Sequence, residues 1–557
     1  MSKLSIRNSS VFLITAIVAV SGFFVADSAL AKNLDTLPAF SAFSNNIKTL
    51  PINKTNTLNL SEPKKKLGTD LLKLIDNSFL LPNQNRAQVI SQMKGLKQFV
   101  ASGDSVATID KRVTNKTHND LVYVYINLKP TVQTSIIDSL VWKVTDRDEK
   151  NHLVVALVDV NKLEALASLS GVKIVSSVLP PVVRIGSVIT EGDIIHQTDD
   201  VRSTYSQSGT GIKIGVISDG VDNIASSKST GDLPAGVTVL SNSVGGDEGT
   251  AMLEIIYDMV PNASLYFHDC GNNTIAFNSA IDDLVAAGVN VIVDDIGWFT
   301  ESFFEDGNVA SHVTSILASN NIVYVSAAGN EADSHYQGEY YNDGYNFHDF
   351  SRNSATNDYL YVNIPNNGKV TVILQWNDSF GSSGNDYDLV LSKLPLVSFG
   401  DLAYSIDVQD GNGDPLEGFT YTNTTGSTIT AEIDISNYHG LAETKTLELF
   451  ILTSNDAYNY TNNITPVDSI FGHPAVPGVI AVGAVAANDP GNDTIESFSS
   501  QGPVTIIGQG QRAKPDIIGI DRVSVTGAGG FYTTFPGTSA AAPHIAAIVA
   551  QLWGQHP

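Results

Sequence analysis

The stretch GIKIGVISDG, residues 211–220, decides the fold class. Its apolar, β-branched run ends abruptly at Asp219-Gly220, which is the pattern of a buried strand followed by a turn. Downstream, stretches of the same kind alternate with stretches whose apolar residues recur at helical spacing. In chain order these are TAMLEIIYDM (helix), ASLYF (strand), AIDDLVAAG (helix), VNVIVDDIG (strand), VASHVTSILAS (helix) and IVYVSAAGN (strand). The alternation predicts an α/β domain, with a parallel sheet covered by helices on both faces.

This alternation is interrupted at about residues 335–460. Four stretches of strand character occur there between Gly, Asn and Asp turns, with no helical pattern among them: GKVTVILQW, NDYDLVLSK, TITAEIDI and TLELFILT. We predict a β-sandwich inserted into a surface loop of the α/β domain. The α/β pattern resumes at GVIAVGAV, so the domain is assigned to residues 205–557 with the insertion inside it.

Residues 69–185 predict a separate, small α+β domain. The stretches LVYVYINL and HLVVALVDV are rich in β-branched residues, which is typical of strands, whereas TVQTSIIDSL and NKLEALASL place apolar residues at helical spacing. Residues 32–68 are rich in Asn, Thr, Ser and Lys and show little periodicity, so we expect a linker there.

The first 31 residues have the layout of a secretory signal peptide. Lys3 and Arg7 precede an apolar run at residues 11–26, and residues 29–31 (ALA) offer small side chains for cleavage. A short membrane anchor is the alternative, but the run is brief and a cleavage site follows it. We therefore expect a secreted or periplasmic protein, with no membrane association once the signal peptide is removed.

The charge balance excludes two classes of partner. The 557 residues include 32 Lys and Arg but 58 Asp and Glu, a net charge of −26, and residues 211–557 hold only nine basic residues against 40 acidic ones. Such a surface repels nucleic acids and anionic membranes. It either keeps an exported protein soluble or docks the mildly basic residues 1–210 by complementary charge.

The single cysteine, Cys270, excludes an intramolecular disulfide framework and a multi-thiolate zinc site. We expect a monomer.

The strongest chemical signal is GTSAAAPHIAAIVAQLW, residues 537–553. A glycine turn delivers Ser539 to the start of a helix whose first residues are nearly all alanine. The unpaired N–H groups and the positive dipole end of a helix start favour negative charge that develops near such a serine. Taken alone, the serine fits an ordinary N-cap as well as a nucleophile.

Chain order adds context to that serine, because Asp219 and Asn330 each follow a predicted strand and Ser539 comes after both. In this order KIGVISDGVD, VYVSAAGN and GTSAAAPH resemble the aspartate, oxyanion and nucleophile motifs of the subtilase superfamily of serine peptidases. Weaker matches are VPNASLYF, VPGVIAVGAV, FSSQGP and KPDI. The resemblance spans residues 211–557 apart from the insertion, and it implies a subtilisin-like fold with Ser539 as nucleophile, Asp219 in the catalytic set and Asn330 as oxyanion donor. Taken alone, Asn330 also fits the alternative of an asparagine that stabilises a turn.

One motif departs from the subtilase pattern. Where family members carry a His-Gly-Thr-His turn, this sequence has EGTA at residues 248–251, so Glu248 takes the position of the general base. Sedolisins, a related family, also use glutamate, but they place a partner aspartate one helical turn later, where this chain has Met252. The chain thus resembles a hybrid of a sedolisin-like base with the Asp219 and Asn330 of subtilases. The alternative for Glu248 is an acid that stabilises the first turn of a helix.

A carboxylate is a weaker base than imidazole at neutral pH, since the usual pKa of glutamate is about 4.3. Two carboxyl groups that share a proton separate their pKa values, so Asp219 and Glu248 together could supply a base. By the resemblance, Asp295 replaces a small polar residue that lines the substrate cleft. Three acids would then surround Ser539 and favour activity at acid pH. The alternative for Asp294-Asp295 is a strand cap or a calcium site.

Other candidates carry less weight. His544 belongs to the nucleophile-helix motif, where subtilases carry a histidine without a catalytic role, and His268 follows the ASLYF strand within reach of the cleft. The stretch NDYDL, residues 385–389, fits either a structural calcium site or a polar turn in the β-sandwich. We expect the chemistry itself to need no cofactor and no metal ion.

The stretch VVALVDVNKLEALASLSGVKIV, residues 154–175, resembles the end of a subtilase-type inhibitory propeptide. The resemblance implies that residues 69–185 cover the cleft before export, so the chain's own propeptide is one of its partners. We expect a zymogen that is processed between Pro181 and Gly211.

These inferences predict an exported serine endopeptidase that acts on polypeptides. The main alternative is a pseudo-peptidase that has kept the fold and binds proteins, because loss of the histidine is one route to such proteins. An acid at the altered position, beside otherwise complete catalytic motifs, favours catalysis. An esterase that uses the same serine fits the sequence equally well.

Overall fold

The computed structural model describes residues 60–81, 84–86, 88–89, 121–178, 190–351, 360–394, 401–438, 442–454, 457–459, 463–531 and 533–555. The predicted signal peptide, most of the predicted linker and the part of the predicted processing region before Thr190 lie outside these residues. Within them, no helix is both long enough and apolar enough to cross a membrane.

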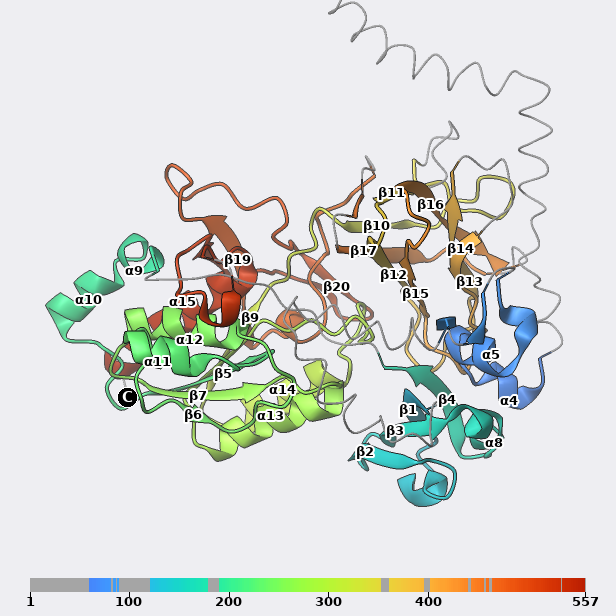
Figure 1. Cartoon of the computed structure of the whole chain (residues 1–557), viewed down its shortest axis with the longest axis horizontal. Helices are drawn as coiled ribbons and strands as arrows, with labels where there is room; N and C mark the ends of the chain where they lie inside the picture. Colours follow the sequence, from blue (N-terminus) through green and yellow to red (C-terminus); the bar gives the residue numbers. More distant parts are fainter. Residues whose placement is uncertain are drawn as a thin grey trace, which may run out of the picture. The chain divides into compact units, whose positions relative to one another are not determined.

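A seven-stranded parallel sheet forms the centre of the C-terminal part of the chain (Figure 1). Its strands, in spatial order, are β22 (Ile517–Asp521), β19 (Val479–Ala486), β9 (Val323–Ala327), β8 (Val291–Asp294), β5 (Lys213–Ser218), β7 (Ser264–Asp269) and β6 (Thr238–Val239). All neighbouring pairs are parallel. The prediction of an α/β domain with a parallel sheet is therefore confirmed.

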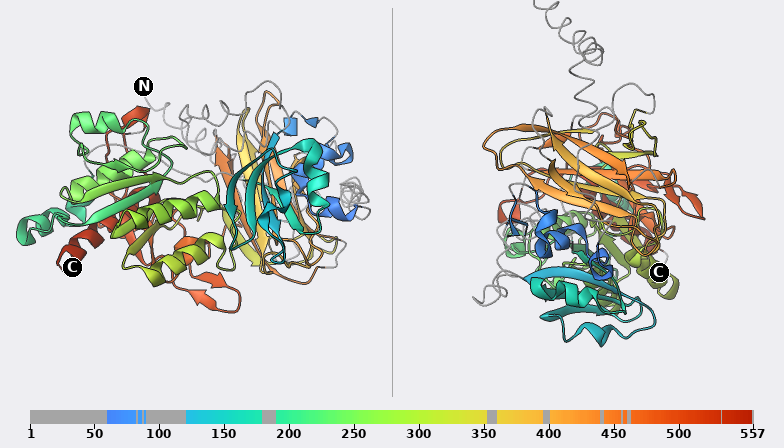
Figure 2. Two further views of the ribbon diagram at one scale, coloured as in Figure 1. Left: turned by 90° about the horizontal axis from the view of Figure 1, so that it is seen from below. Right: turned by 90° about the vertical axis from the view of Figure 1, so that its right-hand side faces the viewer.

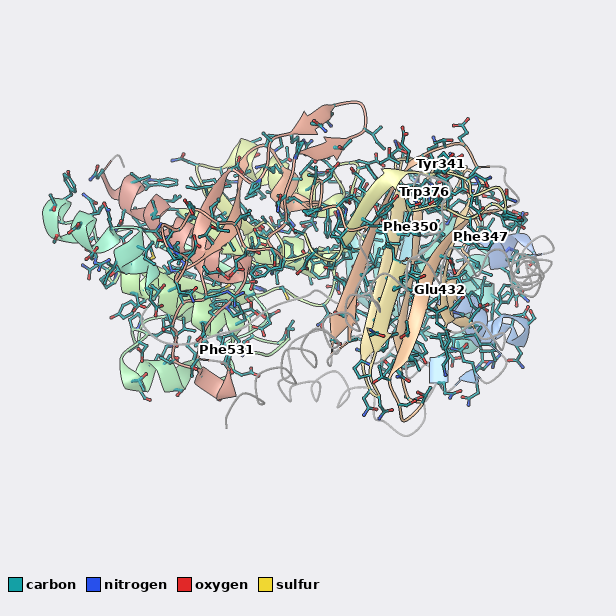
Figure 3. All side chains as sticks on the ribbon, turned by 90° about the horizontal axis from the view of Figure 1, so that it is seen from above. Tyr341, Phe347, Phe350, Trp376, Glu432 and Phe531 are labelled. Carbon is teal, nitrogen blue, oxygen red and sulfur yellow. The ribbon has the colours of Figure 1, made fainter. Side chains whose placement is uncertain are left out.

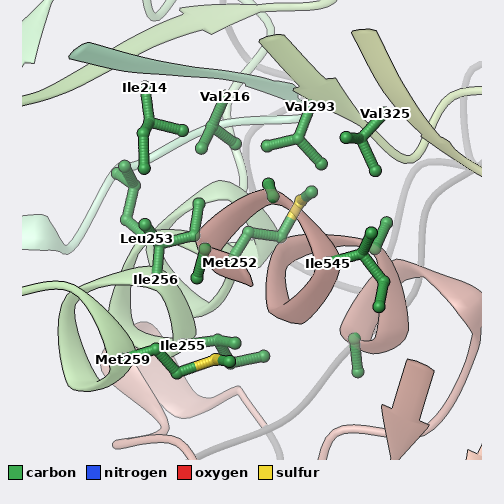
Figure 4. Packing of buried hydrophobic residues seen from close by; sticks show 14 of the residues in the cluster. Ile214, Val216, Met252, Leu253, Ile255, Ile256, Met259, Val293, Val325 and Ile545 are labelled. Atoms are coloured by element: carbon green, nitrogen blue, oxygen red, sulfur yellow. The ribbon is translucent and has the colours of Figure 1, made fainter. Parts of the chain in front are cut away.

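Helices cover both faces of this sheet (Figures 1 and 2). One face packs against α12 (Glu248–Met259) and α15 (Thr538–Gln555), and the other packs against α13 (Thr274–Ala286) and α14 (Asn308–Ser319). Successive side chains of β5 point to opposite faces of the sheet. Val216 therefore packs in the first hydrophobic cluster and Ile217 in the second. Figure 4 shows the first cluster, in which valines and isoleucines of the strands face α12 and α15. The short helices α9 (Gly192–Ile195), α10 (Thr198–Tyr205) and α11 (Ile224–Thr230) complete this region.

Two antiparallel sheets occupy the interruption predicted at residues 335–460, and we call them the two-sheet unit. One sheet has the order β10 (His335–Glu339), β17 (Thr446–Ser454), β12 (Lys369–Trp376), β15 (Leu416–Thr422). The other has the order β14 (Asp401–Ser405), β13 (Tyr387–Lys393), β16 (Ile429–Asn437), β11 (Leu360–Ile364), β18 (Tyr458–Asn459). The sheets share one hydrophobic cluster, which includes Phe350 and Trp376, labelled in Figure 3.

A four-stranded antiparallel sheet, which we call the four-stranded unit, lies within the predicted α+β domain. Its order is β2 (Lys143–Asp148), β3 (Leu153–Asp159), β1 (Leu121–Leu128), β4 (Val172–Ser177). Helix α8 (Leu163–Ala167) follows η4 (Val160–Lys162), close to the predicted helix. The predicted helix at residues 131–140 was wrong, because only the 3₁₀ turn η3 (Thr134–Ile137) forms there. Its β-branched residues are weak helix formers.

Two short helices precede the four-stranded unit. Helix α4 (Glu62–Lys65) lies in the stretch predicted as a linker, and α5 (Thr69–Ile75), followed by η1 (Asn77–Phe79), packs against α8 and β4. The remaining elements are the hairpin of β20 (Val504–Ile506) and β21 (Gly510–Arg512), and the turns η6 (His473–Ala475) and η7 (Ala528–Gly530).

Candidate active site

Asp219 follows β5 and is completely buried. Its Oδ1 accepts hydrogen bonds from the backbone N–H groups of Gly220, Glu248 (3.0 Å) and Gly249 (3.4 Å). Burial raises the pKa of Asp219 well above its usual value, the negative Asp295 raises it further, and the three N–H donors oppose the shift. The chain passes Asp219 very closely at Gly246 (φ +136°), where a Cβ atom would lie 1.7 Å from Oδ2. Only glycine fits there.

Glu248 is the first residue of α12 and is also completely buried. Because its own backbone N–H binds Asp219, the two acids are fixed as neighbours. The side chain of Glu248 forms a hydrogen bond with the side chain of Asp295. A hydrogen bond between two carboxyl groups requires a proton on one of them.

Asp295 comes directly after β8 and is 7% exposed. Its Oδ2 accepts a hydrogen bond of 3.2 Å from the hydroxyl of Ser218. Burial raises the pKa of Asp295 to about 7; hydrogen bonding with Glu248 and the hydrogen bond from Ser218 oppose this rise, and the charge of Asp294 adds to it. The structure thus brings together three of the predicted acids, each from a different element.

Hydrogen bonds between Thr538 and Asn330 hold Asn330 beside the start of α15, where Ser539 lies. The amide Oδ1 of Asn330 accepts hydrogen bonds from the backbone N–H (2.9 Å) and the hydroxyl (3.2 Å) of Thr538. The same hydroxyl accepts a hydrogen bond of 3.2 Å from the N–H of Gly329. Since the amide oxygen is engaged, the NH₂ group of Asn330 is the end that can donate to a ligand. Ser539, the second residue of α15, is 2% exposed.

Asp521 is a site residue that the sequence analysis missed. It ends β22, and its Oδ2 accepts a hydrogen bond of 2.8 Å from the N–H of Gly537, in the turn that presents Ser539. Burial raises the pKa of Asp521 to about 7. The available signal was an acid at the carboxyl end of a parallel strand, the same signal that identified Asp219.

Ser539, Asn330 and Asp295 line one pocket, whereas Asp219 and Glu248 are absent from its walls. The other lining residues are Ile296, Gly297, Phe299, Ala327, Ala328, Gly329, Glu331, Phe471, Pro474 and Thr538. Asp295 therefore connects the pocket to the two acids behind it.

The two-sheet unit supports the wall of this pocket. The rings of Phe299 and Phe471, both lining residues, lie 5.3 Å and 5.1 Å from the ring of Phe450 in β17. In β12, the buried Gln375 donates to the carbonyl of Glu301 (2.8 Å) and accepts from the N–H of Phe303 (3.0 Å). The two-sheet unit thus fixes the loop that carries Phe299.

Neither histidine weighed in the sequence analysis joins the acids. His268 lies on the opposite sheet face from α12, where its Nε2 is 3.4 Å from Asp283 of α13. His544 is buried, and its ring contacts the carbonyl of Ala540 (2.7 Å) and the hydroxyl of Thr190.

One aspartate of each candidate calcium site accepts hydrogen bonds from protein groups. Asp294 accepts from Ser326 (3.0 Å) and from the N–H of Ile296, and its Oδ1 lies 2.9 Å from Nε2 of His473. In the NDYDL stretch, Asp388 accepts a hydrogen bond from Ser436. Within the part of the chain that the structure describes, no cluster of three or more His, Cys, Asp or Glu residues is arranged to hold a metal ion.

The order of these elements and of the site residues agrees with a comparison to known families, since the model of the Subtilase family matches residues 211–557. The chain belongs to the subtilase family. Similar solved structures are those of two proteases and a macrocyclase. The CspB protease of Clostridium perfringens is 15% identical, with 64% of this chain and 84% of that chain covered and a TM-score of 0.41. The PatG macrocyclase in complex with peptide is 12% identical (65% and 82% covered, TM-score 0.29).

The serine protease MycP1, an essential component of the type VII (ESX-1) secretion system, is 11% identical to this subtilase, with 67% of this chain and 81% of that chain covered and a TM-score of 0.28. None of the curated proteins matches the chain.

The buried acids of this subtilase predict that its stability depends on pH. Asp295 has a usual pKa of 3.8 in the unfolded chain and about 7 in the folded protein, so the folded state binds its proton more tightly. The free energy of unfolding should therefore fall as pH rises from about 4 to about 7. Asp295→Asn should make this fall shallower, whereas Asp493→Asn, at an exposed position, should leave it unchanged. Urea unfolding at pH 4 to 8 measures the slope; an equal slope in both variants would contradict the assignment.

The support from the two-sheet unit predicts that Phe450 affects peptide binding. Phe450→Ala should lower the free energy of unfolding by about 3–5 kcal/mol and weaken peptide affinity at least about threefold, because Phe299 and Phe471 lose their packing partner. Ile433→Ala removes a fully buried side chain from the shared core of the same unit, and it should cost stability without a change in affinity. Calorimetric binding of a peptide to the two variants, each combined with Ser539→Ala, separates the effects. Equal affinities would mean that the insertion does not support the pocket.

Proposed function

We propose that this subtilase is an exported, acid-active serine endopeptidase with a carboxylate base. The observation that carries the proposal is the cluster of three buried acids, Asp219, Glu248 and Asp295, of which Asp295 lines the pocket of Ser539 and Asn330. A family member that had merely lost its histidine would have no reason to retain three buried acids at one place, because burial of each carboxyl group costs free energy.

In the proposed reaction, the Ser539 hydroxyl attacks the peptide carbonyl carbon while its proton moves to the Glu248 carboxylate. The amide of Asn330 donates to the oxyanion that forms. When the tetrahedral intermediate collapses, the C–N bond breaks and the proton passes from Glu248 to the leaving amine. A water molecule then attacks the acyl-enzyme in the same way and releases Ser539.

Asp295 takes over the role that the partner aspartate on the helix has in sedolisins. The corresponding position on α12, Met252, is completely buried in the hydrophobic cluster between the helix and the sheet (Figure 4). A partner for Glu248 is supplied instead by the end of β8. We infer that the catalytic set is Ser539, Glu248, Asp219 and Asp295, with no metal ion or cofactor in the chemistry.

Contacts of the four-stranded unit support the proposal of a zymogen. The hydroxyl of Tyr125 accepts a hydrogen bond of 3.1 Å from the N–H of Thr274, the first residue of α13. The side-chain amide of Asn273 donates to Tyr123 (3.1 Å) and to Asp146 (2.9 Å). The four-stranded unit thus packs on the helix layer of the peptidase domain, as we expect for a propeptide that the enzyme processes after export.

The test is peptide hydrolysis by the processed protein from pH 3 to 8. Activity should peak below about pH 6 and decline near pH 7, because ionisation of Asp295 removes the proton of its hydrogen bond with Glu248. Ser539→Ala should abolish turnover, Glu248→Gln should lower it about 10²–10⁴-fold, and Asn330→Ala about 10²–10³-fold. Asp295→Asn should shift or remove the decline near pH 7.

His268→Asn is the matched control, and we expect it to retain the pH profile. A neutral optimum that survives Glu248→Gln would overturn the carboxylate base. No turnover at any pH by processed protein would favour the pseudo-peptidase, and turnover of esters but not of peptides would favour the esterase.

A further inference from the structure

The edge of one sheet in the two-sheet unit is covered by a segment far away in the sequence. Strand β14 is the last strand of its sheet, and among the residues that the structure describes it pairs with β13 alone. The exposed backbone of an edge strand promotes unwanted pairing, so proteins usually cover it. Here helix α5 and η1 lie against β14 and the residues that follow it.

The hydrogen bonds at this contact are specific. The Oδ1 of Asp407 accepts hydrogen bonds from both the backbone N–H and the hydroxyl of Thr69, and the hydroxyl accepts one of 3.1 Å from the N–H of Ile406. At this contact Thr69 is 4% exposed, Ile406 is 3% exposed and Asp407 is half-buried. A carboxyl group that is partly removed from water is stabilised by such donors.

A buried lysine adds a second link. Lys73 is 4% exposed, its Nζ donates to the carbonyl of Tyr404 (3.1 Å), and it lies 4.3 Å from the centre of the Tyr404 ring. The hydroxyl of Tyr404 in turn donates to the carbonyl of Phe79. Lysine is almost never buried unless its charge is compensated, so these contacts are selective for the residues present.

The other side of α5 belongs to the four-stranded unit. Leu71, Leu72 and Leu74 are almost completely buried, and α5 packs against η4, α8 and β4. The backbone of Val175 in β4 pairs with Lys66 and Gly68, just before α5. Helix α5 therefore joins the four-stranded unit, through an apolar face, to the two-sheet unit, through a polar face.

We propose that residues 401–407 of the two-sheet unit are a docking surface for residues 68–80, and that this surface retains the leader, residues 60–178, after the chain is cut. The insertion thereby gains a function: it binds the proposed propeptide at a point outside the cleft and independently of α13. The proposal concerns binding alone, so its test needs no catalysis.

The experiment uses the full chain with Ser539→Ala and a recognition sequence for a site-specific protease in place of residues 182–189. After the cut, gel filtration at successive times gives the dissociation rate of the leader. We expect the leader to co-elute with the body, and Thr69→Val and Lys73→Met each to raise the dissociation rate about tenfold, since each removes hydrogen bonds to buried partners.

Both substitutions are in the leader, so they leave the fold of the two-sheet unit intact; Asp407→Ala tests the same contact from the other side. Glu62→Gln is the control, because it removes a charge from the leader without touching the docking surface. Immediate dissociation of the leader from the body after the parent protein is cut would overturn the proposal. So would release by Asn273→Ala combined with no effect of Thr69→Val and Lys73→Met.

Discussion

The hydrogen bond from the backbone N–H of Glu248 to Asp219 organises the rest of the site. It ties the start of α12 to the end of β5, and the glycine turn before α12 gives it room. Once those two acids are fixed, the end of β8 can meet Glu248 only with a carboxyl group that shares a proton or with a donor. Three buried acids from three different elements thus meet beside one backbone contact.

A second dependence runs through the insertion. The chain leaves the parallel sheet at the end of β9, just before Asn330, and returns to it at β19, just after the wall residues Phe471 and Pro474. Phe450 and Gln375 then contact that wall and the loop after β8 from the insertion side. Because side chains in protein interiors are closely packed, a displacement in the two-sheet unit is transmitted to the pocket wall that it contacts. The two-sheet unit therefore helps to set the shape of the pocket.

The sequence predicted what local patterns encode and missed what distant contacts create. Asp219 and Ser539 were found because a β-branched run, a glycine turn and a small-residue helix are visible within a few residues. Asp521 ends a strand as Asp219 does, but its contact with the turn before Ser539 is not visible in the sequence. Gln375 binds a backbone group of a distant loop, and no periodicity marks it. The wrong helix at residues 131–140 shows the reverse case, in which apolar spacing was helical but β-branched residues and the neighbouring strands decided the conformation.

The buried acids and the composition of the domain have a common physical origin. Residues 211–557 contain only nine basic residues for 40 acidic ones, so ion pairs cannot neutralise most of the carboxyl groups that folding buries. Protonation is the remaining route, and burial raises the pKa of Asp258, Glu301 and Asp521 to about 7, like that of Asp295. A histidine base would become charged as these acids take up protons, and would then no longer accept the proton of Ser539. A carboxylate base, as proposed for Glu248, becomes neutral rather than positively charged when it takes up a proton.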